Sequence, residues 1–171
     1  MRVEQLMSKQ VHWCRPEDSL DRAAQLMWDR DIGALPVCVS DGVTQIVGVI
    51  TDRDICMSAL FQGRALHEIR IADAMTRNLR VCRPEDEAAD AERTMRSAQV
   101  RRLPVVSDSG ELIGVISLAD IAREAAREAI AAQSARGAEA AYEVSESEVG
   151  DTLAAIVQPH RPAGSSASPS L

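Results

Sequence analysis

The sequence predicts an α+β fold in which two copies of a β-α-β-β-α unit pack with pseudo-twofold symmetry. Three observations support this prediction. The chain contains an internal repeat, its apolar residues change between helical and strand spacing within each copy, and its composition suits a folded core. Hydrophobic residues make up 46% of the 171 residues and charged residues 26%, which is ordinary for a globular domain. Extensive disorder is therefore excluded.

The internal repeat is visible when the two halves of the chain are aligned. Three short strings recur in order, namely CRPED at 14–18 and 82–86, LPV at 35–37 and 103–105, and GVIT at 48–51 with GVIS at 114–117. We therefore divide the chain into a first copy at residues 3–62, a second copy at 71–131 and a C-terminal part at 132–171.

The first half of each copy predicts a strand and a helix. In the first copy, residues 11–14 (VHWC) make a short strand candidate that ends before Pro16. Asp18 is a suitable N-cap for the helix that follows, because its side chain can accept a backbone N–H. Apolar residues at 20, 23, 24 and 27 give that helix one buried face.

The second half of each copy predicts a hairpin and another helix. Residues 35–39 are typical of a strand with a proline near its start, residues 40–42 of a turn, and residues 46–50 of a fully apolar strand. The second helix is expected to begin at Thr51 and to end near Gly63. A single copy of about 60 residues would be only marginally stable, so we expect the copies to pack sheet against sheet. This packing would leave two symmetry-related clefts where the second helices begin.

The C-terminal part predicts a helical extension followed by a tail. Residues 119–135 continue the last helix as an alanine-rich stretch of high helix propensity. Residues 138–171 contain five acidic residues and one arginine, which makes this segment an acidic appendage. Its last residues, 159–171, are rich in serine, proline and alanine and are expected to be disordered.

Composition and spacing disfavour several classes of function. The net charge of −7 and the scarcity of aromatic residues argue against nucleic-acid binding. No segment approaches the ~20 apolar residues of a membrane helix and the N-terminus lacks a signal-peptide pattern, so we expect a cytoplasmic protein without membrane contact. The cysteines and histidines lack metal-ligand or nucleophile–base spacing, which predicts reduced cysteines, no metal site and no enzyme activity.

The ordered motifs resemble a tandem pair of CBS (cystathionine-beta-synthase) domains, an arrangement often called a Bateman module. The motifs that carry the resemblance are Met7-Ser8 and Met75-Thr76, Pro16-Glu17-Asp18 and Pro84-Glu85-Asp86, Leu35-Pro36-Val37 and Leu103-Pro104-Val105, and GVITDRD at 48–54 with GVISLAD at 114–120. Each motif alone is weak, but the ordered set occurs twice. The resemblance extends from Val3 to about Ala131.

This resemblance implies a regulatory binding module without catalytic activity. It would hold an adenine nucleotide or a related adenosyl compound between the copies, with AMP, ADP or ATP as an effector and no required cofactor. The sequence leaves open whether Mg²⁺ accompanies a triphosphate. The family pattern G-h-h-[TS]-x-x-D, in which h is apolar, implies that Asp54 and Asp120 accept hydrogen bonds from ribose hydroxyls. It also implies that Thr51 and Ser117 donate to a phosphate.

Physical chemistry supports these roles and also offers an alternative. An ionised carboxylate can accept both donors of a diol, and a helix that begins at Thr51 or Ser117 presents N–H groups to an anion. The same spacing is that of a capping box, in which the hydroxyl and the carboxylate serve only their own helix. The duplication of the whole string favours ligand binding at one or both sites.

The resemblance also implies a lining for the base and for the phosphates. The adenine slot would involve Leu35, Pro36, Leu103 and Pro104, with the first strands near Val11 and Val81, although core packing is the alternative for each of these residues. Phosphates would be met by Arg53, Arg101 and Arg102, because a guanidinium matches phosphate oxygens, although surface arginines are often merely solvated. The first copy has Gly33-Ala34 where the second has Arg101-Arg102, so the two clefts are expected to differ in charge. We expect the arginine-bearing cleft to prefer more highly phosphorylated ligands.

Two classes of function remain after these considerations. The first is a stand-alone regulatory module that binds an adenosine-containing nucleotide and signals through changed packing or through an unidentified protein partner. The second is a structural or adaptor module that works without ligand. Paired modules of this family often form homodimers through their helices, and we expect the same here.

Overall fold

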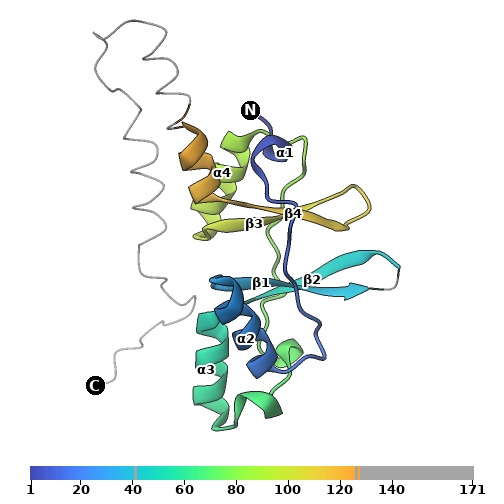
Figure 1. Ribbon diagram of the computed structural model, residues 1–171, viewed down its shortest axis with the longest axis vertical. Coiled ribbons are helices and arrows are strands. Elements are labelled where there is room, and N and C mark those ends of the chain that lie inside the picture. Colours follow the sequence, from blue (N-terminus) through green and yellow to red (C-terminus); the bar gives the residue numbers. More distant parts are fainter. Residues whose placement is uncertain (41, 126, 128–171) are drawn as a thin grey trace, which may run out of the picture.

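The computed structural model describes residues 1–40, 42–125 and 127, and these form two stacked α+β units (Figure 1). We name the units repeat 1 and repeat 2. The elements of repeat 1 are α2 (Leu20–Arg30), β1 (Ala34–Ser40), β2 (Thr44–Thr51) and α3 (Asp52–Gln62). Those of repeat 2 are α4 (Ala88–Ala98), β3 (Arg102–Val106), β4 (Leu112–Ser117) and a helix at 118–125. The predicted α+β fold with two repeats is confirmed, whereas the predicted extension beyond residue 127 and the tail lie outside the described residues.

Each repeat is built around an antiparallel hairpin. In repeat 1 the register places Ala34 opposite Thr51, and in repeat 2 it places Arg102 opposite Ser117. The turns contain Gly42 and Gly110, whose φ angles of +89° and +80° suit glycine. The two ends of each hairpin therefore bring the start of the first strand beside the start of the following helix.

The prediction of a strand at residues 11–14 is wrong. Of these four residues only Cys14 pairs with a strand, through a parallel bridge to Val37. The Cys14 N–H donates to the Pro36 carbonyl at 3.1 Å, and the Cys38 N–H donates to the Cys14 carbonyl at 2.9 Å. Pro36 has no N–H with which to continue this ladder toward the N-terminus. The same arrangement recurs in repeat 2, where Cys82 bridges Val105 next to Pro104.

The N-cap of the first long helix also differs from the expectation. Helix α2 begins after Ser19 and not after Asp18. The Asp18 carboxylate instead accepts the Arg15 N–H at 2.9 Å, so it is engaged by the preceding turn. The second helix of repeat 1 behaves as expected, since Thr51 is the N-cap of α3 and Gly63, with a φ of +60°, is its C-cap.

The two hydrophobic cores exchange segments between the repeats. Val3 of the short helix α1 (Val3–Leu6) is fully buried in the core of repeat 2, and its N–H donates to the Asp86 carbonyl at 2.9 Å. Ile71 of η2 (Ile71–Asp73) is fully buried in the core of repeat 1, which is also contacted by η1 (Leu66–Glu68). Figure 1 shows α1 in the upper unit, beside α4. Each core is thus closed by the segment that precedes the other repeat in the sequence.

The connecting segments tie the repeats together along their inner strands. Ser8 pairs with Val115 of β4, and Thr76 pairs with Val49 of β2, each through two backbone hydrogen bonds. The hairpins themselves are joined by a backbone bridge between Gln45 and Glu111. The space that remains between the repeats lies at the other end of the hairpins, where α3 and the helix at 118–125 begin.

Candidate functional site

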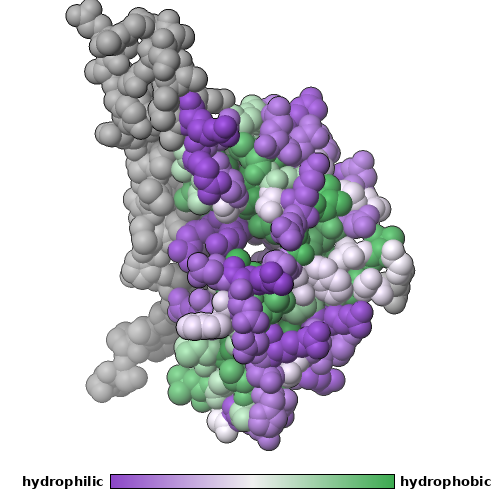
Figure 2. Space-filling model, viewed as in Figure 1, coloured by the Kyte–Doolittle hydropathy of each residue, from purple (hydrophilic) through white to green (hydrophobic). Residues whose placement is uncertain are grey.

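A cavity of about 660 Å³ lies between the repeats and is lined by both of them. Figure 2 shows an opening between the two units, with hydrophilic residues around it. The lining residues come from the N-terminal segment, from the strand starts and from the helix starts, and are Ser8, Gln10, Val11, His12, Ile32, Gly33, Ala34, Leu35, Pro36, Val49, Thr51, Asp52, Arg53, Gln99, Val100, Arg101, Arg102, Pro104, Val115, Ser117 and Asp120. The sites of both repeats therefore open onto one shared cavity, whereas two separate clefts were expected.

Most of the predicted site residues meet at this cavity. Those that line it are Thr51, Ser117, Asp120, Arg53, Leu35, Pro36, Pro104, Arg101 and Arg102. One backbone hydrogen bond in each repeat holds the helix start in place. The Asp52 N–H donates to the Gly33 carbonyl at 3.2 Å, and the Leu118 N–H donates to the Arg101 carbonyl at 2.9 Å. Each helix start is therefore held against the start of the first strand of its own hairpin.

Two predicted site residues do not line the cavity. Leu103 is fully buried in the core of repeat 2, because its side chain points to the face of β3 that packs against the hydrophobic cluster. Asp54 is half-buried at the first turn of α3, and its carboxylate is drawn back onto its own helix start. The position of Leu103 agrees with its core-packing alternative.

The capping-box geometry is present in both repeats. The Asp54 Oδ2 atom accepts the Thr51 hydroxyl at 2.7 Å and the Thr51 N–H at 2.9 Å, while the Asp54 N–H donates to Thr51 Oγ1 at 3.2 Å. Ser117 and Asp120 repeat these three contacts at 2.6, 3.0 and 3.2 Å. Each hydroxyl and one oxygen of each carboxylate therefore stabilise their own helix in the absence of ligand.

The second oxygens of these carboxylates differ between the repeats. The Asp120 Oδ1 atom accepts Arg123 Nη1 at 3.0 Å, and the Arg123 side chain is 68% exposed. The Asp54 Oδ1 atom has no hydrogen-bond partner among the residues that the structure describes. An exposed arginine can be exchanged for another donor at little cost, because surface ion pairs contribute about 0–1 kcal/mol. Asp120 is thus the carboxylate that combines a place on the cavity with an exchangeable oxygen.

The charges on the cavity favour an anionic ligand. Arg53, Arg101 and Arg102 are exposed, and within the described part of the chain their side chains form no ion pair. Asp52 and Asp120 are the two carboxylates on the same lining. Three guanidinium groups against two carboxylates leave a net positive lining, although the whole chain carries a net charge of −7. Local attraction of phosphate is therefore compatible with an acidic protein.

The N-terminal segment is the part of the lining that sequence reasoning largely missed. Val11 was expected near the adenine slot and His12 as an exposed strand residue. The structure places both on the cavity as half-buried residues. Ser8 and Gln10 line it as well. Their polar side chains and the absence of regular structure offered no local signal, because their position depends on the pairing of Ser8 with Val115 across the repeats.

Three of the four cysteines are unsuited to act as nucleophiles. All four are free, as predicted, and Cys14, Cys38 and Cys82 are buried. Burial raises the pKa of each of these three thiols to about 12, so they remain protonated at neutral pH. Over the described residues, no group of three or more His, Cys, Asp or Glu is placed to hold a metal ion. No helix of that same part is long and apolar enough to cross a membrane.

Comparison with known protein families identifies the repeat unit. The sequence model of the CBS domain matches the chain twice, at residues 3–60 and 71–127. The chain belongs to the CBS domain family. The two matches show a tandem CBS pair, in agreement with the resemblance seen in the sequence.

Similar CBS pairs make up most of one relative and a small part of another. It is 36% identical over 120 residues to the CBS domain-containing protein YhcV of Bacillus subtilis, with 70% of this chain and 82% of that protein covered. It is 34% identical to an inosine-5′-monophosphate dehydrogenase of Korarchaeum cryptofilum, of which the match covers only 23%. Among solved structures, the CBS domain pair of protein MJ0100 in complex with 5′-methylthioadenosine and S-adenosyl-L-methionine is similar, with a TM-score of 0.65, 26% identity, and 75% of this chain and 98% of that chain covered.

Proposed function

We propose that this CBS pair is a regulatory module that binds an adenosine-containing nucleotide in the cavity between its repeats. The observation that carries the proposal is the meeting of the Ser117–Asp120 pair with three arginines on one 660 Å³ cavity. A cavity of this size suits a small ligand, and these groups suit a sugar diol and phosphates. Occupancy would signal by favouring one packing of the repeats over another, or by changing the surface offered to a protein partner.

Asp120 is the proposed acceptor for the ribose diol. One oxygen of its carboxylate caps the helix, and the other is held by the exposed Arg123. An ionised carboxylate offers about four lone-pair sites, so capping and diol binding are compatible. Ribose hydroxyls would displace Arg123, whose guanidinium can return to solvent. The Ser117 hydroxyl would face the phosphates.

The aliphatic part of the lining is the proposed contact for the base. Leu35, Pro36 and Pro104 line the cavity from the two hairpins, and Val11 lines it from the N-terminal segment. A flat apolar base can be held by such surfaces together with a few backbone polar groups. The MJ0100 CBS pair, which was solved with 5′-methylthioadenosine and S-adenosyl-L-methionine, supports an adenosyl group as the common part of the ligand.

The proposal predicts different results for the same substitution in the two capping boxes. Asp120→Asn should weaken nucleotide binding by about tenfold or more, because it removes a charged acceptor from the diol. Asp54→Asn, at the matching place in repeat 1, should leave the affinity within about twofold, because that carboxylate does not line the cavity. Isothermal titration calorimetry with AMP, ADP, ATP, NADH, S-adenosylmethionine and cyclic dinucleotides measures these affinities.

Unfolding curves of both variants provide the control for folding. Each variant loses part of one helix cap, so each should be destabilised by a similar amount of about 1 kcal/mol. Equal binding by the parent and Asp120→Asn would contradict the assignment of Asp120. Failure of every compound in this panel to bind the parent protein would contradict the proposed function.

A ligand-free adaptor is the second candidate, and one observation favours it. Both hydroxyl–carboxylate pairs are already satisfied within their own helices, so the fold does not require a ligand at these positions. In either case we propose that the chain forms a homodimer through its helices and carries no catalytic activity of its own. The extensive coverage of YhcV, whose name records only CBS domains, supports a stand-alone module.

A further inference from the structure

The cavity is chemically different at its two ends. At the repeat 1 end the strand start carries Gly33 and Ala34, which have almost no side chain, and the half-buried Ile32 and Val11 lie beside them. The matching strand start of repeat 2 carries two exposed arginines at positions 101 and 102. The strand start of repeat 1 is therefore small and aliphatic, and that of repeat 2 is cationic.

Within the described residues, only the first of the two connecting segments lines the cavity. Residues 8–12 line the cavity through Ser8, Gln10, Val11 and His12, whereas none of the matching residues at 76–80 does so. Gly33 and Ala34 carry at most a methyl group, whereas Arg101 and Arg102 at the matching positions carry guanidinium groups. The part of the cavity beside Gly33 and Ala34 is therefore the proposed base recess.

The first turns of α3 and of the helix at 118–125 also differ in how they would receive an anion. In α3 the first three N–H groups are all engaged, and Asp52 places a carboxylate at the first helical residue, where its Oδ1 atom accepts the Arg53 N–H at 2.7 Å. In repeat 2 the matching residue is Leu118, followed by Ala119, whose N–H makes no hydrogen bond to the described residues. A carboxylate at a helix start competes with a bound anion, whereas an open N–H attracts one. Phosphates are therefore favoured at the repeat 2 end.

We propose that the cavity holds one nucleoside di- or triphosphate per chain, with the base in repeat 1 and the phosphates against Arg101 and Arg102. This inference rests on the proposed function and adds the number, the orientation and the charge of the ligand. A neutral or cationic adenosyl compound would leave both guanidinium groups without a partner. A second nucleotide in the opposite orientation would place its phosphates at Arg53 beside the Asp52 carboxylate, and its base between Arg101 and Arg102.

Titration of the full chain with adenosine, AMP, ADP and ATP tests the number and the charge. We expect one molecule per chain and an affinity that rises by about tenfold or more from AMP to ATP, since each phosphate adds charge-assisted hydrogen bonds. Two molecules per chain, or equal affinities for AMP and ATP, would overturn the inference and leave the proposed function intact. Binding of none of these compounds and of no other compound of the wider panel would overturn both.

Exchanging residues between the repeats tests the orientation. Arg101→Gly with Arg102→Ala gives repeat 2 the residues of repeat 1, and should reduce the AMP-to-ATP ratio of affinities to about threefold or less while adenosine binds as before. Gly33→Arg gives repeat 1 the residue of repeat 2, and should abolish binding of all four compounds by filling the base recess. A Cβ atom at residue 33 would meet only the Asp52 side chain, at 3.2 Å from Oδ2, so the fold should tolerate it.

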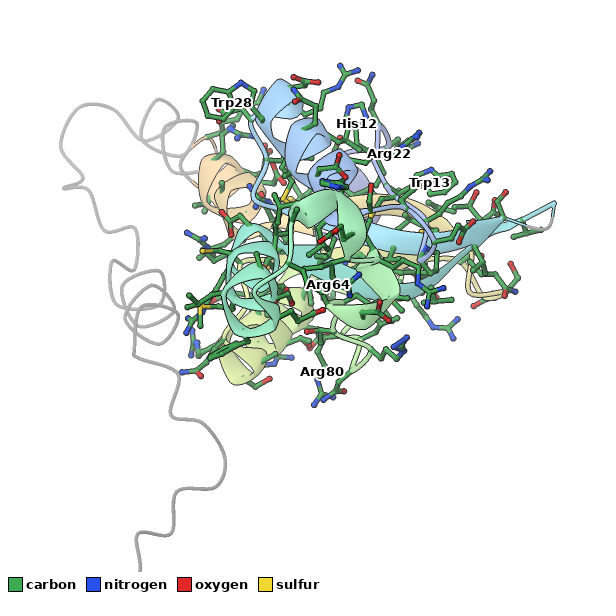
Figure 3. The ribbon with its side chains drawn as sticks, turned by 90° about the horizontal axis from the view of Figure 1, so that it is seen from below. His12, Trp13, Arg22, Trp28, Arg64 and Arg80 are labelled. Atoms are coloured by element: carbon green, nitrogen blue, oxygen red, sulfur yellow. The ribbon has the colours of Figure 1, made fainter. Side chains whose placement is uncertain are left out.

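Arg80→Ala is the control for loss of positive charge. Figure 3 shows Arg80 at the outer surface, and it does not line the cavity. This variant should bind all four compounds as the parent does. Thermal unfolding of each variant shows whether it is folded. An unchanged AMP-to-ATP ratio in the folded double variant, or full ATP binding by folded Gly33→Arg, would overturn the proposed orientation.

Discussion

At the scale of single residues, two glycines mark close contacts between a hairpin and a connecting segment. A Cβ atom at Gly114 would lie 2.7 Å from Met7 Sδ and 3.1 Å from the Ser8 carbonyl oxygen. Gly48 repeats these contacts with Met75 and Thr76 at 2.6 and 3.1 Å. Neither glycine has a positive φ, so the requirement is for space and not for backbone conformation. The G of the G-h-h-[TS]-x-x-D pattern therefore makes room for a methionine of the connecting segment.

Gly114→Ala should lower the free energy of unfolding by about 1–3 kcal/mol, because the added methyl group overpacks the contact with Met7. Met7→Ala should also be destabilising, since it removes a half-buried side chain from the core of repeat 2. The double variant should be more stable than the sum of the two effects predicts, because Met7→Ala makes space for the new methyl group. Chemical denaturation of the four proteins gives the coupling energy, and strict additivity would contradict the contact.

Single residues were predictable where only near neighbours decide their role. Thr51 and Gly63 were identified as helix caps because their partners lie within one turn of α3. Asp18 was misplaced because aspartate and serine are comparable N-caps, and the N–H that engages Asp18 belongs to the preceding turn. The difference between Asp54 and Asp120 was not predictable from their identical motif, since it arises from how each box faces the cavity.

At the scale of elements, the boundaries of the sequence repeat differ from those of the cores. In the sequence, α1 precedes repeat 1 and η2 precedes repeat 2. In the structure, α1 contributes to the core of repeat 2 and η2 to the core of repeat 1. Val3 and Ile71 occupy matching positions in the two copies, and both side chains are fully buried. An alignment of the copies reveals that these residues correspond, but not which core each one enters. That choice depends on contacts between distant parts of the chain.

This exchange predicts which half of the molecule each substitution loosens. Val3→Ala should increase amide hydrogen exchange in α4, β3 and β4, and Ile71→Ala should increase it in α2, β1 and β2. Each should lower the stability of the affected core by about 2 kcal/mol or more, because a cavity replaces a fully buried side chain. Exchange measured by mass spectrometry on peptides of each repeat distinguishes the two patterns. The opposite pattern, with each substitution acting on its own sequence repeat, would contradict the exchange of segments.

At the scale of the whole molecule, the pseudo-twofold symmetry of the backbone contrasts with an asymmetric surface. The helices of repeat 1 expose large apolar side chains, with Trp28 84%, Leu60 69% and Phe61 78% exposed. Figure 3 shows Trp28 extending outward from α2, and Figure 2 shows hydrophobic residues over the far end of α3. The matching positions of repeat 2 hold Arg96 for Trp28 and Arg127 for Phe61. Exposed apolar groups of this size are typical of an interface.

This asymmetry predicts that a homodimer forms through the helices of repeat 1. Two copies of the same apolar face can bury each other about a twofold axis, whereas the helices of repeat 2 would bring arginines together. Trp28→Arg and Phe61→Arg each copy the residue of repeat 2, and together they should weaken dimerisation by about tenfold or more. Val43→Arg adds the same charge at an exposed position in the β1–β2 turn and should leave the dimer unchanged. Sedimentation velocity over a range of concentrations measures the equilibrium, and a monomeric parent or a double variant that dimerises as the parent does would contradict the prediction.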